Sequence, residues 1–135
     1  MFGKKKEKKY NFSNIRVMHY EGLNFPTNFP CVLNLTESAL TITRRVMPDV
    51  TVTLPINQIR SFSCMAEPEF TLKYHGQAVN TSKMNGIIKQ FLVVEYTTKD
   101  GSKEWLAFWG TAKEGRKFLN MQYHGLPEQA QNYSL

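Results

Sequence analysis

The sequence predicts a mainly β domain, a β-barrel or sandwich closed by one carboxy-terminal α-helix. Short runs that alternate apolar and polar residues recur between residues 15 and 110, which is the period of half-buried strands. Lys99, Asp100 and Gly101 separate two runs rich in β-branched and aromatic residues, as the loop of a hairpin does. One helical pattern follows, from Thr111 to His124.

Length and charge indicate a single domain with a basic amino-terminal arm. The chain has 135 residues, enough to bury a core of its own. Its formal net charge is +6, but residues 1–10 carry five lysines against one glutamate, which is +4, so the rest carries +2. We therefore expect a disordered arm over residues 1–12, a domain over residues 13–126 and a tail over residues 127–135.

The two cysteines and the amino-terminal arm indicate where in the cell the protein is expected. Cys31 and Cys64 have no paired spacing, which indicates a reduced cytoplasmic protein whose thiols fill the core. The arm is not followed by an apolar run long enough for a signal peptide or a membrane span.

The first predicted strand covers residues 15–23. One face of this strand carries Ile15, Val17, His19 and Glu21, and the other carries Arg16, Met18, Tyr20 and Gly22. The loop from Asn24 to Pro30 repeats an Asn-Phe-Pro unit, and its prolines exclude a regular central strand. We expect Phe25 and Phe29 to plug the end of the barrel, and an exposed recognition loop is the alternative.

Residues 31–45 predict a hairpin that turns at Glu37 and Ser38. Its inward residues are Leu33, Leu35, Leu40 and Ile42. Arg44 and Arg45 end the second strand, where paired arginines suit an anion. The alternative is that both are solvated charges that protect a sheet edge from aggregation.

The middle of the chain continues the sheet. A short strand over residues 50–54, a helical turn over residues 55–59 and a strand over residues 60–65 are expected. Phe70, Leu72 and Tyr74 alternate with polar residues and predict another short strand. The polar residues 76–86 predict a mobile loop.

The hairpin of residues 91–110 can close with a two-residue or a three-residue loop. The three-residue loop separates the faces more cleanly, because a slip of one residue would exchange them. It places two inward apolar pairs opposite each other, Val94 with Leu106 and Leu92 with Phe108. Trp105 and Trp109 then lie on the outer face.

Thr111 and Glu114 form a capping box that begins the closing helix. The inward stripe predicted for this helix is Ala112, Gly115, Leu119 and Tyr123, with Phe118 and Gln122 at its margin. Gly125 is expected to end the helix in the left-handed conformation, and Pro127 prevents its continuation.

This order of elements resembles the pleckstrin-homology-like superfold, in particular its small bacterial and GRAM-like members. The resemblance spans about residues 13–126 and is carried by Gly22-Leu23, VLNLTESALTITRR, LPINQIRSF and LVVEYTTKDGSKEWLAFWG. It implies two roughly orthogonal antiparallel sheets capped by one helix, and a scaffold that contacts proteins or membrane surfaces, in some members through self-assembly.

Two departures from that family limit what carries over. The loop from Asn24 to Pro30 lacks the basic residues with which lipid-binding members hold phosphoinositides. The tryptophan of the family's closing helix is absent between Ala112 and His124, where Phe118 is expected to take a related role. Phosphoinositide binding is therefore not implied.

The sequence predicts a non-enzymatic protein with no catalytic, cofactor-binding or metal-binding residues. It has no phosphate-binding glycine loop, nucleophile elbow or helical His-Glu motif, and His19, His75 and His124 lack metal-ligand spacing. The predicted function is protein–protein interaction or self-association, with Trp105, Trp109, Phe25 and Phe29 as candidate contacts.

The alternative function is peripheral binding to an anionic membrane surface at the inner face of the membrane. The candidate contacts are Lys4, Lys5, Lys6, Lys8 and Lys9, with Arg44 and Arg45 as further anion contacts. Nucleic acid is disfavoured because the arm lacks arginine and the domain lacks a basic face. An apolar small ligand is disfavoured because the bulky inward residues fill a small barrel.

Overall fold

The computed structural model describes residues 12–45, 48–77, 83–84 and 87–127, and it has the predicted mainly β class with a carboxy-terminal helix. The strands are β1 (Ile15–Glu21), β2 (Phe29–Leu35), β3 (Ala39–Arg44), β4 (Val50–Pro55), β5 (Ile59–Ala66), β6 (Lys83–Met84), β7 (Ile87–Ile88), β8 (Gln90–Thr97) and β9 (Lys103–Gly110). The helices are η1 (Ile56–Gln58), α1 (Glu67–His75), α2 (Ala112–Asn120) and η2 (Met121–Gly125). No helix of the described residues is long and apolar enough to cross a membrane.

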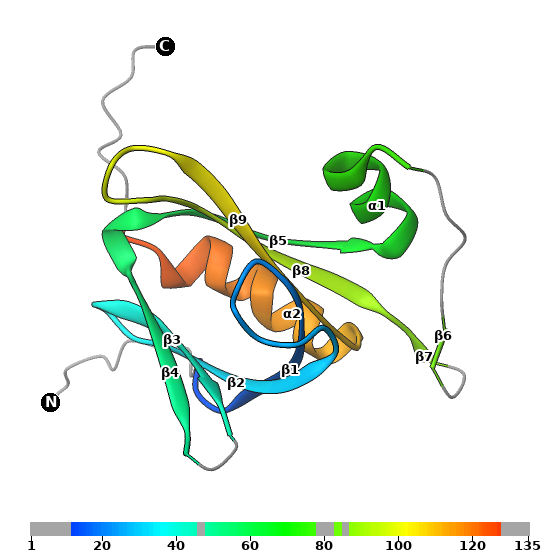
Figure 1. Ribbon diagram of the computed structural model, residues 1–135, viewed down its shortest axis with the longest axis horizontal. Coiled ribbons are helices and arrows are strands. Elements are labelled where there is room, and N and C mark those ends of the chain that lie inside the picture. Colours follow the sequence, from blue (N-terminus) through cyan, green and yellow to red (C-terminus); the bar gives the residue numbers. More distant parts are fainter. Residues whose placement is uncertain (1–11, 46–47, 78–82, 85–86, 128–135) are drawn as a thin grey trace, which may run out of the picture.

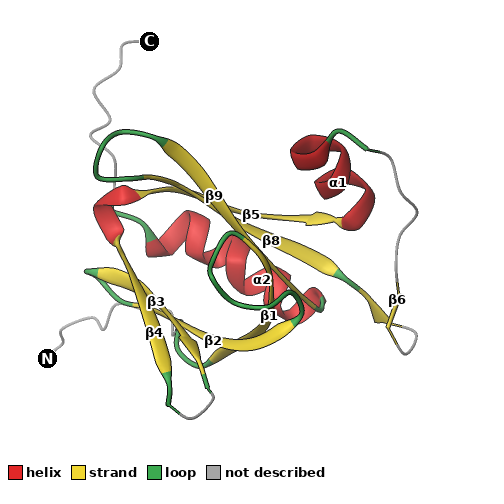
Figure 2. Cartoon of the chain, viewed as in Figure 1, coloured by secondary structure: helices red, strands yellow, loops and turns green. Residues whose placement is uncertain are grey.

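Seven strands form one bent antiparallel sheet in the order β4-β3-β2-β1-β9-β8-β5, and β6 pairs with β7 separately. The bend lies where β1 meets β9, because a register shift between His19 and Glu21 interrupts their pairing. Figure 1 shows the two halves diverging from this join, with α2 spanning the space between them. Figure 2 shows the same arrangement by element type, with the one long helix on the inner side of the strands. The two sheets expected from the sequence are thus two halves of one sheet.

The hairpin of β8 and β9 has the predicted register. Val94 lies opposite Leu106 and Leu92 opposite Phe108, and none of the four is more than 2% exposed. The Thr98 N–H donates to the Ser102 carbonyl at 2.8 Å, which leaves a three-residue loop with Gly101 at φ +96°. The three-residue loop is confirmed, and it is what keeps the apolar residues on one face.

The hairpin of β2 and β3 turns at Glu37 and Ser38, as predicted, and this sets Leu33 opposite Ile42 and Leu35 opposite Leu40. β2 begins at Phe29, two residues earlier than expected, so that Pro30 lies in the strand opposite Met18. A proline is tolerated there because it stands next to the first residue of the strand.

The closing helix begins as predicted but presents a different face. The Thr111 N–H donates to Glu114 Oε1 at 2.8 Å, as in a capping box. Phe118 is fully buried, whereas Leu119 is 46% exposed and Tyr123 is 76% exposed. The prediction that Leu119 and Tyr123 face inward is therefore wrong, whereas Gly115 is buried as predicted. A Cβ on Gly115 would lie 2.7 Å from Cys64 Sγ, so the helix rests on β5 there. The rotation of the helix brings Phe118 against Phe62 of β5, with the rings edge-on at 5.5 Å.

Gly125 does not end the helix in the left-handed conformation, since the glycines with positive φ in the described residues are Gly22, Gly76 and Gly101. The helix instead continues through a π turn, η2, up to Gly125. A Cβ on Gly125 would lie 2.6 Å from Leu35 Cδ2. Close packing of the helix end on β2, and not backbone conformation, is what this glycine permits.

The predicted strand at residues 69–74 is wrong, because these residues belong to α1. Pro68 stands in the first turn of the helix, and Gly76 ends it with φ +69° and an N–H bond to the Leu72 carbonyl at 3.1 Å. Phe70 is 1% exposed and packs on the outer face of β8 and β9, while Leu72 is 60% exposed. The helix therefore creates a second core on the face that was expected to be open.

The loop between β1 and β2 is held by His19. The Leu23 N–H donates to His19 Nε2 at 3.2 Å, and the other ring nitrogen, Nδ1, lies 3.0 Å from the Pro26 carbonyl oxygen. His19 is 1% exposed, and its ring meets Phe25 edge-on at 5.6 Å. Both ring nitrogens are engaged by backbone, so this histidine organises the loop.

Candidate functional site

The two tryptophans lie on the outer face of the sheet, as predicted, but this face is covered. Trp109 is 6% exposed, its Nε1 donates to Asn28 Oδ1 at 2.7 Å, and Lys89 Nζ lies 4.7 Å from its ring. Trp105 is half-buried, with the Tyr74 ring at 4.7 Å. They are therefore not an open aromatic surface, and the cover is α1 and the loop before β2.

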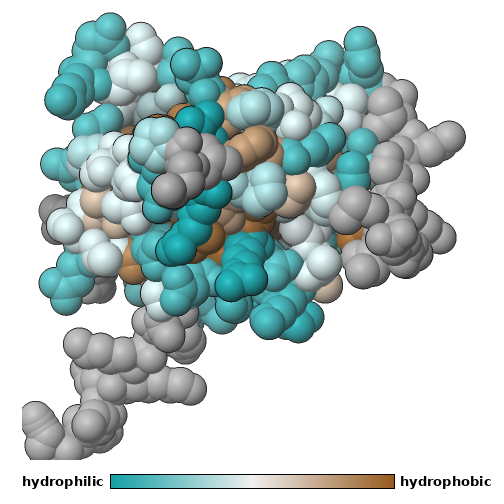
Figure 3. Space-filling view, turned by 60° about the horizontal axis from the view of Figure 1, so that its bottom comes forward, coloured by the Kyte–Doolittle hydropathy of each residue, from teal (hydrophilic) through white to brown (hydrophobic). Residues whose placement is uncertain are grey.

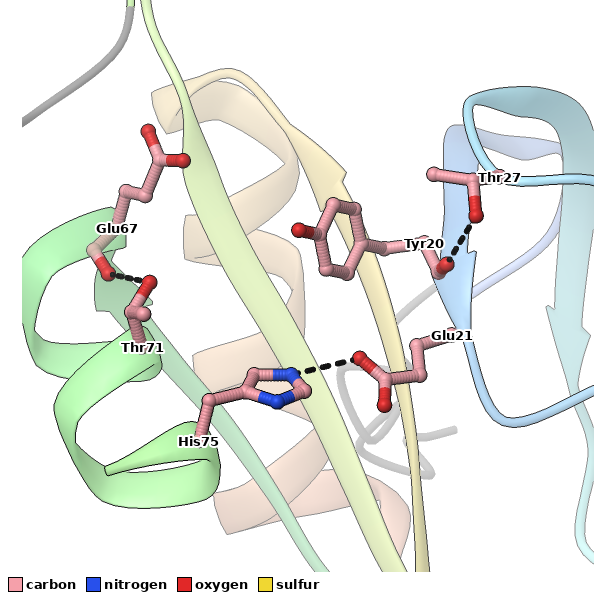
Figure 4. Close-up of polar contacts among 6 residues, drawn as sticks. All are labelled: Tyr20, Glu21, Thr27, Glu67, Thr71 and His75. Atoms are coloured by element: carbon pink, nitrogen blue, oxygen red, sulfur yellow. Dashed lines mark hydrogen bonds and ion pairs between the residues drawn. The ribbon is translucent and has the colours of Figure 1, made fainter. Parts of the chain in front are cut away.

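Polar contacts fasten α1 over this face at its carboxy-terminal end. The Tyr74 hydroxyl donates to Glu95 Oε2 at 2.6 Å, and Arg60 Nη1 lies 3.6 Å from Glu95 Oε1. Burial and the hydrogen bond to Glu95 raise the pKa of Tyr74, so its hydroxyl keeps its proton at neutral pH. Figure 4 shows His75 reaching from α1 to Glu21 at the end of β1, with 2.8 Å between Nε2 and Oε1.

The two arginines at the end of β3 do not converge on one anion. Consecutive residues of an extended chain point to opposite faces. The Arg44 guanidinium lies at the barrel end, 5.3 Å from the centre of the Phe25 ring and 5.8 Å from that of Phe29. Arg45 is exposed on the outer face. The structure therefore separates a pair that was predicted to act together.

Phe25 and Phe29 close the barrel end, as expected for a plug. Both are half-buried, and Phe25 packs against the main core. With Arg44 stacked over both rings, neither presents an isolated apolar surface.

A groove of about 730 Å³ crosses the outer face of β1 and β2 beside the start of α2. Pro30, Met18 and Trp109 form one row across three strands, since Met18 lies opposite both of the others. Arg16 and Val32 form the next row. Further lining residues are Asn14, Val17, Cys31, Arg45, Gly110, Thr111 and Glu114.

The rim of the groove is cationic on the strand side. Arg16 and Arg45 are exposed, and within the described part of the chain neither makes an ion pair. Glu114 lies on the helix side, where its Oε1 accepts hydrogen bonds from the Thr111 N–H at 2.8 Å and the Thr111 hydroxyl at 2.5 Å. Burial opposes its charge, but these bonds outweigh burial and lower the pKa of the carboxyl. The carboxylate is therefore engaged by the helix cap, and the two arginines remain to receive an anion.

The surface around these strands is mixed. Figure 3, which brings the lower side of Figure 1 forward, shows hydrophobic residues in patches between hydrophilic ones. An apolar floor with polar and charged borders is typical of non-obligate protein-binding surfaces.

Comparison with protein-family models, with curated proteins and with solved structures finds no match to this chain. The chemistry of the groove therefore rests on its own geometry. Two side chains, Arg16 and Arg45, supply charge, and the row of Pro30, Met18 and Trp109 supplies apolar contact.

Several predicted residues fall outside what the structure describes. Lys4, Lys5, Lys6, Lys8 and Lys9 lie in residues 1–11, and most of the predicted mobile loop lies in residues 78–82 and 85–86.

The two thiols lie inside the fold. Cys31 is buried, and burial raises the pKa of its thiol to about 11. Burial likewise raises the pKa of Cys64, which is half-buried. Both are protonated at neutral pH, which fits the expected role as core residues. No group of three or more metal-ligating side chains occurs among the described residues.

Proposed function

We propose that the chain is a non-enzymatic interaction module with a pleckstrin-homology-like fold, which binds an extended acidic segment of a partner protein in the groove. The observation that carries the proposal is the groove itself, where Arg16 and Arg45 stand on different strands above one apolar floor. The bent sheet has four strands in one half and three in the other, and a helix follows the last strand. This arrangement supports the resemblance to the pleckstrin-homology-like fold. The helix α1 between β5 and β8 was not expected from that resemblance.

Binding rather than catalysis is supported by the roles of the ionisable side chains. Glu95 holds Tyr74, Glu114 caps α2, and both ring nitrogens of His19 contact backbone. These contacts are structural, and general acid–base catalysis needs such a group to be aimed at a substrate. The interior is packed as well, because Leu33, Leu40, Ile42, Leu92 and Phe108 are each 0% exposed.

The groove suits a segment with alternating acidic and apolar side chains. In an extended chain, neighbouring side chains point to opposite sides, so apolar ones can contact Met18 and Pro30 while acidic ones reach the arginine rim. Arginine favours carboxylates because its guanidinium can donate two parallel hydrogen bonds. Affinity is therefore expected to fall with salt.

This function is tested with a short fluorescent peptide that alternates glutamate with leucine. We expect the full chain to bind it, and Arg16→Glu or Arg45→Glu to weaken binding about tenfold or more, which corresponds to about 1.4 kcal/mol. Fluorescence anisotropy at low and high salt measures both effects.

Lys103→Glu is the matched control, since it makes the same charge change at an exposed residue of β9 that does not line the groove. Equal losses in all three variants would mean that the peptide responds only to net charge, and the proposed site would be wrong. A peptide with lysine in place of glutamate should not bind.

The second candidate function is peripheral binding to an anionic membrane surface, favoured by the five lysines of residues 4–9. Near such a surface each lysine contributes on the order of 1 kcal/mol. We expect the full chain to sediment with vesicles that contain phosphatidylserine and not with neutral vesicles. Replacing the five lysines by serine should abolish sedimentation, as should raised salt. Undiminished sedimentation of the serine variant would reject the arm as the contact.

A further inference from the structure

β4 is the last strand on one side of the sheet, and its outer edge is unpaired within the described residues. Its sequence, VTVTLP, is uncharged and rich in β-branched residues. It pairs with β3 over six consecutive residues without a register shift, from Ala39 opposite Pro55 to Arg44 opposite Val50. Edge strands usually carry a charge, a bulge or a cover that discourages further pairing, and among the described residues β4 has only its terminal proline.

The other edge of the sheet is β5, and a side chain occupies one of its outward backbone groups. The Phe62 N–H of β5 donates to the Gln122 side chain of the closing helix at 2.8 Å. A side chain thus occupies a backbone donor that a further strand would otherwise use. Only the β4 edge is regular and uncapped among the described strands at the two ends of the sheet.

Two hydrogen bonds reveal which backbone groups of β4 face outward. The Ile56 N–H donates to the Ser38 carbonyl, and the Thr36 N–H donates to the Ala39 carbonyl. In a regular antiparallel ladder the bonded pairs alternate, so Val50, Val52 and Leu54 direct their backbone groups to β3. The N–H and C=O groups of Thr51 and Thr53 therefore point to the open edge, together with the Pro55 carbonyl. Both threonine side chains are exposed.

We propose that the β4 edge pairs with the β4 edge of a second copy of this chain, antiparallel and centred on Val52. This contact goes beyond the proposed binding of an acidic segment and does not use the groove. In this register Thr51 of one copy lies opposite Thr53 of the other. Each of these two pairs exchanges two N–H···O=C bonds, and Val52 faces its own equivalent. The interface is isologous, so it closes at two copies.

Side chains favour this register over a shifted one. On the outer face, Thr51 Oγ1 already lies 3.1 Å from Thr43 Oγ1 of β3, and Thr41 stands opposite Thr53. Pairing through Val52 continues this row of threonines across the two copies. Val50 meets Leu54 on the other face, and no charged residue within either strand is placed opposite a like charge. Cross-strand threonine pairs and apolar pairs are both favourable.

The test is the assembly state of the full chain, measured by sedimentation velocity over a range of concentrations. The wild type should show a monomer–dimer equilibrium. Thr51→Lys/Thr53→Lys should raise the dissociation constant at least about tenfold, because it places lysine opposite lysine in the second copy. Thr51→Lys/Thr53→Glu should retain the dimer, since lysine then faces glutamate.

Thr53→Pro is a further variant that removes an outward donor and leaves the ladder with β3 intact. It should be monomeric with an unchanged circular dichroism spectrum. If it fails to fold, the two charge variants decide alone. A wild type that stays monomeric at the highest concentration reached, or two charge variants that dimerise equally, would overturn the proposal. Peptide binding in the groove by such a monomer would show that the failure concerns the edge and not the interaction function.

Discussion

Phe118→Ala should lower the free energy of unfolding by about 3–5 kcal/mol. Phe118 is 0% exposed, and its ring meets Phe62 of β5 edge-on at 5.5 Å. Truncation removes the side chain by which α2 fills the space between the halves of the sheet, and the closely packed strands can collapse only partly into the cavity. Total stabilities of domains are about 5–15 kcal/mol, so the loss is a large share. Urea unfolding followed by circular dichroism measures it.

Leu119→Ala is the matched control, one residue further along the same helix. Leu119 is 46% exposed, so we expect a loss of about 1 kcal/mol or less. The helical pattern in the sequence predicted the opposite order, with Leu119 inward. A larger loss for Leu119→Ala than for Phe118→Ala would restore that prediction and refute the observed rotation of the helix.

Phe70→Ala is expected to cost about 3–5 kcal/mol as well, for a different reason. Phe70 joins α1 to the outer face of the sheet, with the Phe91 ring stacked at 4.6 Å and the Tyr20 ring edge-on at 5.7 Å. Its removal should loosen α1 from the sheet. Both tryptophans of the chain belong to this second core, so their fluorescence should shift to longer wavelength as water reaches them.

Leu72→Ala provides the comparison for Phe70, because Leu72 lies on the same helix but is 60% exposed. We expect little change in stability or in tryptophan emission. A strand over residues 69–74 would place both side chains on one face, and the two substitutions would then have similar effects. Similar losses would therefore contradict α1.

The pairing of strands within a hairpin could be predicted from the sequence, because it depends on the two-residue alternation of apolar side chains and on the residues of the turn. Gly101 supplies the positive φ that a three-residue loop needs, and a slipped register would bury Glu95 against an apolar partner. The same logic held for Leu33 and Ile42 in β2 and β3. Such contacts join residues close in sequence, and the hydrophobic pattern alone selects between the registers.

The errors arose where two patterns overlapped. In EPEFTLKYHG the alternation of Phe70, Leu72 and Tyr74 indicates a strand, but helix signals are present too. Pro68 suits the first turn of a helix, and Gly76 suits a left-handed cap at its end. The acidic Glu67 and Glu69 also lie in the first turn, and the basic Lys73 and His75 lie in the last one, as the helix dipole favours. In α2 the contact of Phe118 with Phe62 of β5 accompanies the rotation of the helix, and this long-range contact has no local signature.

The groove could be predicted only in part. The alternation in the first strand placed Arg16 and Met18 on the same face, and the structure shows that this is the outer face. Trp109 stands in the same row because β1 pairs with β9, a strand some ninety residues further along the chain. The sequence pattern does not specify this pairing. The separation of Arg44 from Arg45 follows from the two-residue period of a strand. The same period places Arg44 on the inward face with Leu40 and Ile42, so this separation could have been predicted from the sequence.

The central claim is that the binding surface lies on the outer face of β1 and β2 beside α2. The most direct measurement is an amide NMR titration of the full chain with the glutamate–leucine peptide. We expect shifts in the groove rows, at Arg16, Met18, Val32 and Trp109, while the 98–102 hairpin loop stays unchanged. Shifts centred on that loop or on α1, with the groove rows unaffected, would contradict the claim.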